Sequence, residues 1–522
     1  MMKSYMLAIA SGILFWLGFA GFLHPALSWF ALVPLLFALE KKTPKTSLLL
    51  GWLAGLTAHM IAYYWILHTL RVFGELNLAA SSFVHLLLCL EQSLQFGAFA
   101  LFLSWMRRHS TKPDMSSLRR QGSHEIPAFA GMTQQSLLFL VPVAWVASEF
   151  LWPQLFPSYF GNSQFEWIPF IQIADITGIL GLSAVLALVN AAIFLFLQHF
   201  FRTKKFLWKP LVIAFGIVSV VLGYGYFRLP MIQKEIAAAP TLSVGMAQTN
   251  IGMKERFDDP QGAYHRYLSM SHHLQERGVS LMVWPETALL DPSLREEEKK
   301  IPEGLFEGIQ TPLLFGAHVE RQTKVKHHEY NAAVLMNADR SIAGIYRKQK
   351  LLAFGDYIPL GTRFPILYEW IPNTGRFEPG DSDMPIVWNG ISFGMSICYE
   401  DILPRLVRRG MKYAPDLFVN LTNDSWFGDT REPMIHLALA TFRSVEQRRA
   451  LVRSTNTGIS AFVDPTGKIV ARTEQYQPAL LIHRVPLLKG KTFYMMFGDW
   501  IGYLSLALFV YFLIRRKRSS YQ

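Results

Sequence analysis

Long apolar runs constrain the fold of this chain more than any other feature of its sequence. A helix needs about 20 apolar residues to cross the hydrocarbon core of a bilayer. Runs of about this length, the second and fifth of them shorter, cover residues 5–24, 26–40, 47–70, 78–105, 136–152, 172–200, 208–228 and 493–514. Of the 522 residues, 51% are hydrophobic and only 17% are charged, which excludes a disordered chain and disfavours an ordinary soluble enzyme. We expect a polytopic helical membrane domain of about eight spans.

The basic residues predict how these spans are oriented. Four clusters of lysine and arginine follow the second, fourth, sixth and eighth apolar runs. They are Lys41, Lys42 and Lys45; Arg107, Arg108, Lys112, Arg119 and Arg120; Arg202, Lys204, Lys205 and Lys209; and Arg515, Arg516, Lys517 and Arg518. With eight spans and a cytoplasmic N-terminus, every cluster lies on the cytoplasmic side, as the positive-inside rule requires. The segment 230–490 then lies outside the cytoplasm.

The net charge of +12 therefore reports topology rather than an acidic partner. Residues 1–239 carry 16 basic and 9 acidic side chains, residues 240–488 carry 28 of each, and residues 489–522 carry 6 and 1. The excess belongs to the apolar ends of the chain, and the middle is neutral. This distribution argues against nucleic-acid binding, which requires a concentrated basic surface.

Three domains are predicted. Residues 1–229 form the first transmembrane part, with a flexible cytoplasmic insertion at 107–135, and residues 491–522 form a last span and a basic tail. Between them, residues 230–490 alternate short apolar runs with amphipathic stretches, the pattern of an α/β domain with buried sheets. The expected strands include Leu242–Ala247, Ser280–Trp284, Thr311–Ala317, Ala332–Met336, Phe393–Ile397 and Leu417–Leu421, and the expected helices Gly262–Glu276 and Pro433–Ala450.

Three short motifs place chemically useful side chains in this α/β domain. Glu286 follows an apolar strand in Val283-Trp284-Pro285-Glu286-Thr287, Lys348 lies in Tyr346-Arg347-Lys348, and Cys398 ends a strand in Gly394-Met395-Ser396-Ile397-Cys398-Tyr399-Glu400-Asp401. Groups at the carboxyl ends of strands commonly form sites in α/β proteins. Each residue alone also fits a structural role: a surface glutamate at a turn, a basic turn, or a packed thiol.

Together the three side chains form a coherent catalytic set. A thiol is mostly protonated at neutral pH and needs a base or a cation nearby to act as a nucleophile. Glu286 is suited to take the proton, and Lys348 to hold the charge of a tetrahedral intermediate. The only other cysteine, Cys89, lies in an apolar run and is interpreted as packing. No metal-binding motif and no phosphate-binding glycine loop accompanies the set, so no cofactor is expected.

The order Glu, Lys, Cys on these motifs resembles the nitrilase, or carbon–nitrogen hydrolase, superfamily. Seven leading spans and one trailing span narrow the resemblance to its membrane branch, the bacterial apolipoprotein N-acyltransferase family. Further matching stretches are Asn250-Ile251, Tyr330-Asn331, Asn423-Asp424-Ser425-Trp426-Phe427-Gly428 and Arg453-Ser454-Thr455-Asn456-Thr457-Gly458. The resemblance implies an extracytoplasmic αββα sandwich with a Glu-Lys-Cys triad at its strand ends.

The resemblance also implies roles for individual residues. Cys398 matches the nucleophile, Glu286 the general base and Lys348 the oxyanion-stabilising lysine. The residues matched to the pocket or to its support are Asn331, Asp356, Tyr399, Glu400 and Phe257. Asp356 stands where the family usually has glutamate, and Phe257 where tryptophan is frequent, so a hydrogen bond at each position is in question.

The implied reaction is acyl transfer in two steps. Cys398 takes an acyl chain from a phospholipid, and the thioester then passes it to the free α-amine of a diacylglyceryl-modified apolipoprotein, the last step of lipoprotein maturation. The partners are therefore these two lipid substrates, and the expected location is the bacterial inner membrane, with the catalytic domain on the periplasmic side. We expect a monomer.

Two other functions remain possible interpretations of the sequence. A membrane-tethered nitrilase or amidase would hydrolyse its thioester with water, although eight spans are excessive for a tether. A transporter with an extracytoplasmic binding domain would place ionisable residues inside its spans. The candidates for such residues are Glu91, Glu149, His59, His68 and His85.

Overall fold

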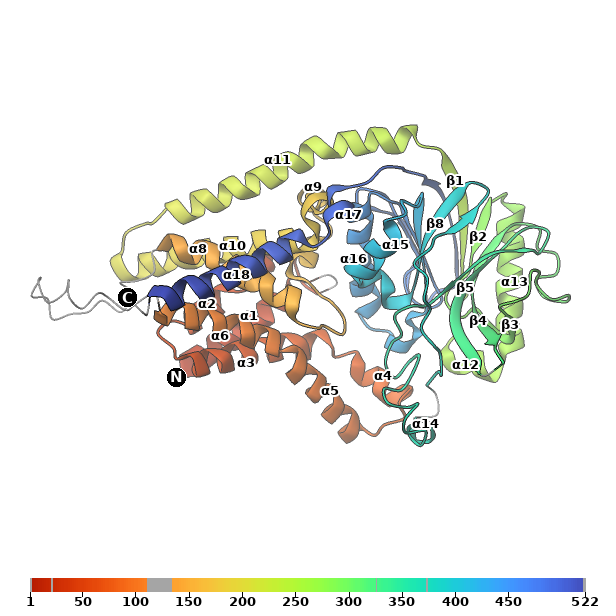
Figure 1. Cartoon of the computed structure of the whole chain (residues 1–522), viewed down its shortest axis with the longest axis horizontal. Coiled ribbons are helices and arrows are strands. Elements are labelled where there is room, and N and C mark those ends of the chain that lie inside the picture. The colour runs from red at the N-terminus through yellow and green to blue at the C-terminus, as the bar shows by residue number, and fades with distance from the viewer. Residues whose placement is uncertain (1, 20–21, 110–133, 325, 372–373, 520–522) are drawn as a thin grey trace, which may run out of the picture. The chain divides into compact units, whose positions relative to one another are not determined.

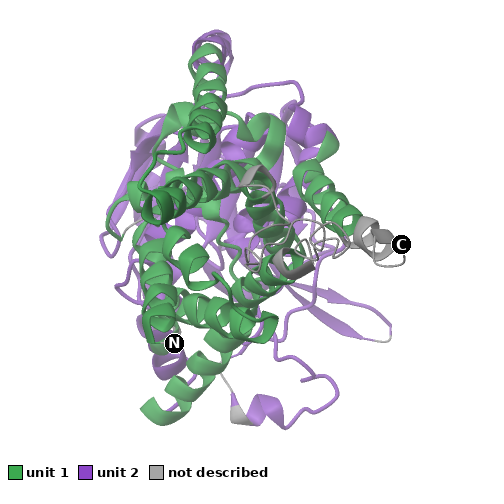
Figure 2. Ribbon diagram, turned by 90° about the vertical axis from the view of Figure 1, so that its left-hand side faces the viewer, with its two compact units in different colours: residues 1–67, 78–227, 497–522 green, residues 68–77, 228–496 purple. Residues whose placement is uncertain are grey.

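The computed structural model describes residues 2–19, 22–109, 134–324, 326–371 and 374–519. They belong to two compact units (Figure 2): residues 1–67, 78–227 and 497–522 form unit 1, and residues 68–77 and 228–496 form unit 2. Most of the predicted insertion at 107–135 lies outside the described residues. Unit 2 therefore takes in ten residues from the N-terminal part of the chain, a feature that the sequence did not predict.

All the secondary-structure elements in the described residues of unit 1 are helices (Figure 1). Its helices are α1 (Met2–Leu17), η1 (Pro25–Trp29), α2 (Val33–Ala38), α3 (Pro44–Ala62), α5 (Leu78–Gln92), α6 (Leu94–His109), α8 (Gln134–Leu151), η2 (Phe160–Gln164), α9 (Ile168–Ile171), α10 (Ala174–Thr203) and α18 (Trp500–Ser519). Two further helices, α4 (Ile66–Val72) and α11 (Lys209–Ala238), run from unit 1 into unit 2. Aromatic side chains fill its interior: the ring of Phe15 stacks on Phe160 at 4.8 Å and meets Trp145 at 5.6 Å.

Not all of the predicted spans are long enough to cross a bilayer by themselves. In the described part of the chain, three helical stretches have the length and hydropathy for it: Leu78–Met106, Ala174–Thr203 and Lys209–Ala238. A fourth arises if α3 and α4, bent by 56° at their junction, count as one broken span. The remaining predicted runs correspond to shorter apolar helices: Met2–Leu17, Pro25–Ala38, Leu137–Leu151 and Trp500–Phe512. The apolar helices are thus confirmed, and the number of spans stays a prediction.

Unit 2 is built on two sheets, as the α/β prediction required. The first sheet has the order β13-β1-β2-β4-β5-β6, with β3 paired to β4, and the second has the order β12-β11-β10-β9-β8-β7. The strands of the first are β1 (Thr241–Gln248), β2 (Leu281–Val283), β3 (Leu289–Arg295), β4 (Leu313–Gln322), β5 (His327–Met336), β6 (Ile342–Arg347) and β13 (Ala479–Pro486). The strands of the second are β7 (Ile386–Trp388), β8 (Ile391–Ile397), β9 (Leu417–Thr422), β10 (Leu451–Thr455), β11 (Ala461–Val463) and β12 (Ile469–Arg472).

Helices cover the outer faces of the two sheets (Figure 1), which gives the predicted αββα layering. Helix α13 (Pro260–Glu276) lies on the first sheet, and α15 (Pro404–Met411) and α16 (Glu432–Gln447) lie on the second. The shorter helices of unit 2 are α12 (Met253–Asp258), α14 (Leu367–Trp370), η3 (Cys398–Ile402), η4 (Asp424–Phe427) and α17 (Phe493–Phe497).

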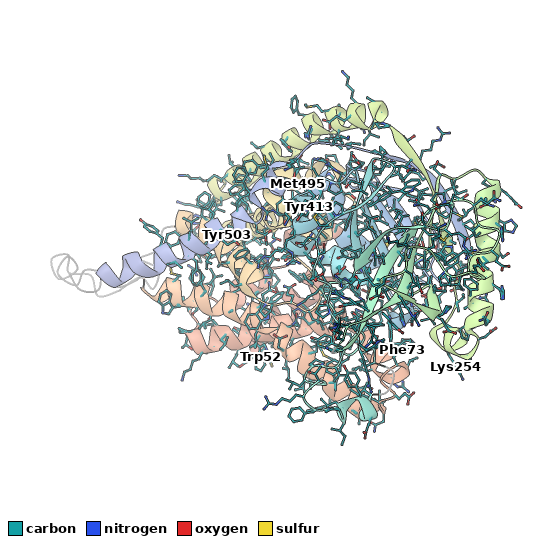
Figure 3. All side chains as sticks on the ribbon, turned by 45° about the vertical axis from the view of Figure 1, so that its right-hand side comes forward. Trp52, Phe73, Lys254, Tyr413, Met495 and Tyr503 are labelled. Atoms are coloured by element: carbon teal, nitrogen blue, oxygen red, sulfur yellow. The ribbon has the colours of Figure 1, made fainter. Side chains whose placement is uncertain are left out.

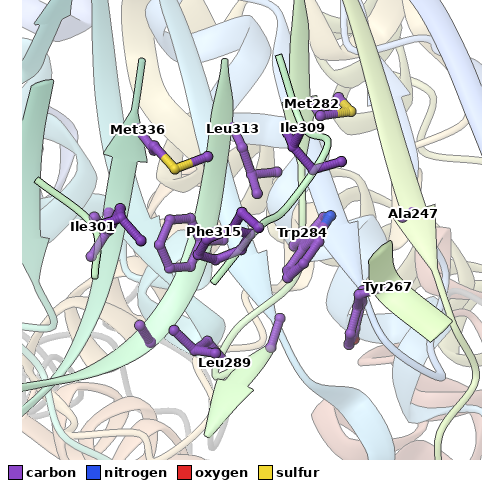
Figure 4. Close-up of a cluster of buried hydrophobic side chains, with 14 of the residues drawn as sticks. Ala247, Tyr267, Met282, Trp284, Leu289, Ile301, Ile309, Leu313, Phe315 and Met336 are labelled. Atoms are coloured by element: carbon purple, nitrogen blue, oxygen red, sulfur yellow. The ribbon is translucent and has the colours of Figure 1, made fainter. Parts of the chain in front are cut away.

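A buried aromatic cluster fixes the end of β2 (Figure 4). The ring of Trp284 stacks on Tyr267 at 4.9 Å and packs against Phe306 at 5.3 Å. Its indole Nε1 donates a hydrogen bond of 2.7 Å to Ser271 Oγ on α13. Burial of large rings supplies much of the packing free energy of a core. These ring contacts and the hydrogen bond fix the position of Trp284. They therefore also fix where the backbone leaves the sheet on its way to Glu286.

Candidate active site

The three predicted catalytic residues meet at the strand ends of unit 2. Glu286 follows β2, Lys348 follows β6 and Cys398 follows β8. Their exposed fractions are 5%, 2% and 3%, and they line one cavity of about 330 Å³. The rest of its lining is Arg256, Thr287, Leu290, His318, Asn331, Leu352, Gly355, Asp356, Thr374, Gly375, Phe377, Asn423 and Trp426. Since β2 and β6 belong to the first sheet and β8 to the second, both sheets build the site.

Two carboxylates hold the ammonium group of Lys348. Its Nζ lies 2.9 Å from Glu286 Oε1 and 2.8 Å from Asp356 Oδ2. Burial alone would lower the pKa of Lys348, but the charges of Asp356 and Glu286 outweigh it, and the pKa lies well above its usual value. The lysine is therefore a fixed positive charge, as oxyanion stabilisation requires. The shorter side chain of Asp356 still reaches Lys348, and its Oδ2 also accepts a hydrogen bond of 2.7 Å from the Leu352 backbone.

Glu286 is positioned so that one of its oxygens is left for a reacting proton. Oε1 accepts hydrogen bonds from Lys348 and, at 2.8 Å, from Asn331 Nδ2, whereas Oε2 has no hydrogen-bond partner among the described residues. The glutamate loop also lies close against β4. A Cβ at Gly316 would come within 2.3 Å of Thr287 N and 2.6 Å of Glu286 Cα. Only glycine at this position lets the loop approach the strand.

Cys398 lies on a sharp elbow between β8 and η3. Its φ of 55° is in the left-handed region, which residues other than glycine rarely adopt. Asn420 Nδ2 on β9 donates a 2.9 Å hydrogen bond to the Cys398 carbonyl and a 3.0 Å bond to Ser396 Oγ. Burial and the nearby Glu286 charge raise the pKa of the Cys398 thiol well above its usual value. Cys398 is thus a thiol at rest, and a base has to remove its proton before its sulfur can act as a nucleophile.

Glu400 links the elbow at Cys398 to the backbone that follows Lys348. Its Oε1 accepts hydrogen bonds from the backbone N–H groups of Gln349 (2.7 Å) and Lys350 (2.8 Å). Its Oε2 accepts from Ile397 N and from Tyr346 Oη. Burial raises the pKa of Glu400 to about 7 in spite of these donors. Next to it, Tyr399 Oη donates to the Leu351 carbonyl at 3.0 Å, so both residues connect β8 to the segment that carries Lys348.

A buried charge cluster, made of Asp401, Asp424, His436 and Arg453, lies behind the elbow. Arg453 pairs with Asp401 at 2.6 Å and with Asp424 at 3.1 Å. The two ring nitrogens of His436 lie 2.9 Å from Asp401 Oδ1 and 3.2 Å from Asp424 Oδ1. Asp424, His436 and Glu432 have ligand atoms within 4.8 Å of one another, a spacing that would suit a metal ion. The guanidinium of Arg453 already supplies the positive charge there, so this donor set does not fit a cation.

The charge cluster predicts a pH-dependent stability. Burial would lower the pKa of His436, but Asp401 and Asp424 raise it to about 9 from 6.5. A raised histidine pKa contributes stability that is fully present below pH 6.5 and is lost as the pH rises through about 9. We expect the melting temperature of the wild type to exceed that of His436→Gln by a margin that shrinks between pH 6.5 and 9. Thermal unfolding of both proteins across this range measures the margin.

The comparison with His436→Gln is needed because a second group titrates in the same direction. Burial raises the pKa of Glu432 to about 8, which also removes stability as the pH rises. The charge of His436 opposes this rise, so the two titrations depend on each other, and both proteins are therefore measured in a Glu432→Gln background, which removes the second titration. A margin that stays constant from pH 6.5 to 9 would show that His436 is not held in its charged form.

Most of the residues predicted for the pocket meet at this site. Asn331 and Asp356 line the cavity, and Tyr399 and Glu400 brace its walls. The side chain of Phe257 lies outside the described residues. Among the residues that were missed is Arg256, whose only signal in the sequence was its place beside Phe257.

Trp426 lies in one of the stretches that match the family, and it also lines the cavity, which the sequence did not predict. Thr69 Oγ1 donates a 2.8 Å hydrogen bond to the Trp426 carbonyl, and the ring of Phe73, labelled in Figure 3, lies 4.7 Å from the Trp426 ring. Residues 68–77, the N-terminal portion of unit 2, therefore support one wall of the cavity.

The two sheets and the residues at their strand ends define a carbon–nitrogen hydrolase-type domain, and a family model of that description, Carbon-nitrogen hydrolase, matches residues 243–491. A second model, Apolipoprotein N-acyltransferase N-terminal domain, matches residues 11–192. Proteins named apolipoprotein N-acyltransferase match almost the whole chain. That of Bdellovibrio bacteriovorus is 31% identical over 88% of this chain and 84% of its own length. The protein of Azotobacter vinelandii is 30% identical over 98% of this chain and 95% of its own length. The protein of Geobacter metallireducens is 29% identical over 100% of this chain and 97% of its own length. The chain belongs to the apolipoprotein N-acyltransferase family.

Proposed function

We propose that this protein is an N-acyltransferase that moves an acyl chain from a phospholipid, through a thioester on Cys398, to the α-amine of a diacylglyceryl-modified lipoprotein cysteine. The observation that carries this proposal is the cavity lined by the buried side chains of Glu286, Lys348 and Cys398, in a chain that belongs to the apolipoprotein N-acyltransferase family. The membership supports the substrates, and the cavity supports the chemistry.

The first half of the proposed reaction forms the thioester. Glu286 takes the thiol proton of Cys398 through its free Oε2, and the sulfur attacks the ester carbonyl of the phospholipid. Lys348 and the backbone N–H that follows the nucleophile stabilise the negative oxygen of the tetrahedral intermediate. When the carbon–oxygen ester bond breaks, Glu286 returns the proton to the leaving alkoxide. A lysophospholipid departs, and the acyl chain stays on the sulfur.

The second half transfers the chain. The neutral amine of the acceptor attacks the thioester carbonyl, Lys348 again stabilises the oxygen, and Glu286 takes a proton from the amine. The carbon–sulfur bond breaks, the thiol regains its proton, and an amide is formed. The two substrates use one cavity in turn, which is the arrangement of a ping-pong enzyme.

The membrane setting is part of the proposal. We place unit 1 in the bacterial inner membrane with about eight spans, and the catalytic unit on the periplasmic side. The apolar helices and the four basic clusters support this orientation. Helices too short to cross alone, such as α1, are accommodated as spans together with the turns that flank them, by tilt or by local bilayer thinning. The acyl donor and the lipid-modified acceptor are both membrane lipids, so the enzyme acts where they reside.

The decisive test follows both halves of the reaction in one assay. The purified protein is incubated with a phospholipid carrying a labelled acyl chain, with and without a synthetic peptide that begins with diacylglyceryl-cysteine. We expect label on the protein alone in the absence of peptide and amide-linked label on the peptide in its presence, both read by mass spectrometry. Release of labelled free fatty acid at the same rate with and without peptide would instead identify a hydrolase that uses water.

A further inference from the structure

One cationic side chain of the cavity has no role in the proposed reaction. Arg256 belongs to α12, is 4% exposed and lines the same cavity as Cys398. In the described part of the chain its Nη2 has no hydrogen-bond partner, and its guanidinium makes no ion pair. Burial lowers the pKa of Arg256, and the nearby charge of Glu286, with which Arg256 forms no ion pair, opposes this shift only in part.

Three other buried arginines of unit 2 are held differently. Arg453 pairs with Asp401 and Asp424, and Arg443 pairs with Glu446 at 2.9 Å. Arg449 donates to the backbone carbonyls of Gln447 and Gly490. A buried charge without a partner is costly, and proteins nearly always pair such groups. Arg256 is therefore best explained by a partner that comes with the ligand.

The neighbours of Arg256 in the cavity leave it available to an anion. Lys348 pairs with one oxygen of Glu286 and with Asp356, and neither carboxylate forms an ion pair with Arg256 among the described residues. Burial and the charge of Arg256 lower the pKa of His318, which also lines the cavity, to about 4, so this imidazole is neutral at physiological pH. A guanidinium presents parallel N–H donors that match the geometry of a phosphate better than a lysine does.

We propose that Arg256 binds the phosphodiester group of the acyl donor and so selects glycerophospholipids over uncharged esters. The inference rests on the proposed function, in which the ester carbonyl of the donor is attacked by Cys398. In a glycerophospholipid the phosphate lies only a few bonds from that carbonyl, so both groups fit one cavity. Arg256 is then a specificity-determining residue, whose contact orients the ester on the nucleophile.

The test compares two acyl donors that differ in the phosphate. Formation of the thioester on Cys398 is measured with a phosphatidylglycerol and with an uncharged p-nitrophenyl ester of the same acyl chain, in the same detergent. For Arg256→Gln we expect the ratio of kcat/KM values, phospholipid over uncharged ester, to fall by at least about tenfold, since a charge-assisted contact is lost. Arg256→Lys keeps the positive charge but not the parallel N–H donors of the guanidinium. Its kcat/KM ratio should lie between those of the wild type and Arg256→Gln.

Lys254 provides a matched control on the same helix. It is exposed, does not line the cavity and is labelled in Figure 3. Lys254→Gln removes one positive charge from α12, and the ratio should stay at the wild-type value. An equal loss on both donors in Arg256→Gln, or no loss on either, would overturn the phosphate contact. Failure of the proposed function looks different, because the wild type itself would then form no thioester from the phospholipid.

A second measurement does not depend on the lipid. Glycerol 3-phosphate should inhibit the reaction of the wild type with the uncharged ester competitively. In Arg256→Gln its inhibition constant should rise by at least about tenfold, in line with the loss of a charged hydrogen-bond pair. An unchanged inhibition constant would place the phosphate elsewhere and contradict the proposal.

Discussion

Cys398→Ala is expected to abolish acyl transfer and to leave no labelled acyl chain on the protein. In the proposed reaction Cys398 forms the covalent intermediate, and alanine offers no atom that can replace the sulfur. Alanine lacks only the sulfur atom of the cysteine side chain, so the substitution removes little packing volume even though Cys398 is buried. Intact-protein mass spectrometry after incubation with a phospholipid reads the result directly. A thermal unfolding curve close to that of the wild type shows that the fold is kept.

The chain supplies its own control for this experiment. Its only other cysteine, Cys89, is buried in α5 with its Sγ 3.4 Å from His85 Nε2. Cys89→Ala should form the thioester and transfer the chain as the wild type does. Label that persists in Cys398→Ala but disappears in Cys89→Ala would show that the nucleophile is assigned to the wrong cysteine.

Lys348→Met is expected to lower the rate of thioester formation by about 10² to 10³-fold, the range found when one oxyanion donor is removed. Methionine has a similar length but no positive charge. The substitution also leaves the buried carboxylates of Glu286 and Asp356 without their shared cation. Breaking a buried ion pair from one side costs about 3–5 kcal/mol, so a lower melting temperature should accompany the loss of activity.

A double variant separates the two effects of Lys348. In Lys348→Met combined with Asp356→Asn, one of the two uncompensated carboxylates becomes neutral. The melting temperature should recover part of the loss, whereas the rate should stay low, since the oxyanion still lacks its cation. If the double variant recovered activity along with stability, or if Lys348→Met alone stayed within about threefold of the wild-type rate, the lysine would be structural.

The strand ends of the α/β domain could be predicted because the signal is local. Runs such as Ser280–Trp284 and Leu417–Leu421 are short, apolar and bounded by polar residues, and the structure has β2 and β9 there. Weaker runs escaped prediction. The strand β3, Leu289–Arg295, contains Asp291 and Pro292 and alternates poorly, and β12, Ile469–Arg472, has only four residues.

The supporting contacts of the site could not be predicted, because they join residues far apart in the chain. No sequence pattern pairs Gly316 with the Glu286 loop or Glu400 with the N–H groups after Lys348. The charge cluster joins Asp401 and Arg453, which lie in different motifs. Arg256 is inconspicuous in a polar stretch of sequence, and only its burial without a partner distinguishes it.

Residues 68–77 have a consequence for any attempt to isolate the catalytic part of this enzyme. A fragment cut out at residue 228 would keep the triad but lose Thr69 and Phe73, which hold Trp426 at the cavity wall. Such a fragment would contain the complete α/β sandwich, but the cavity wall at Trp426 would lack its supporting contacts. The N-terminal half of the chain thus supplies ten residues of the catalytic unit, which a sandwich joined to some other N-terminal sequence would lack.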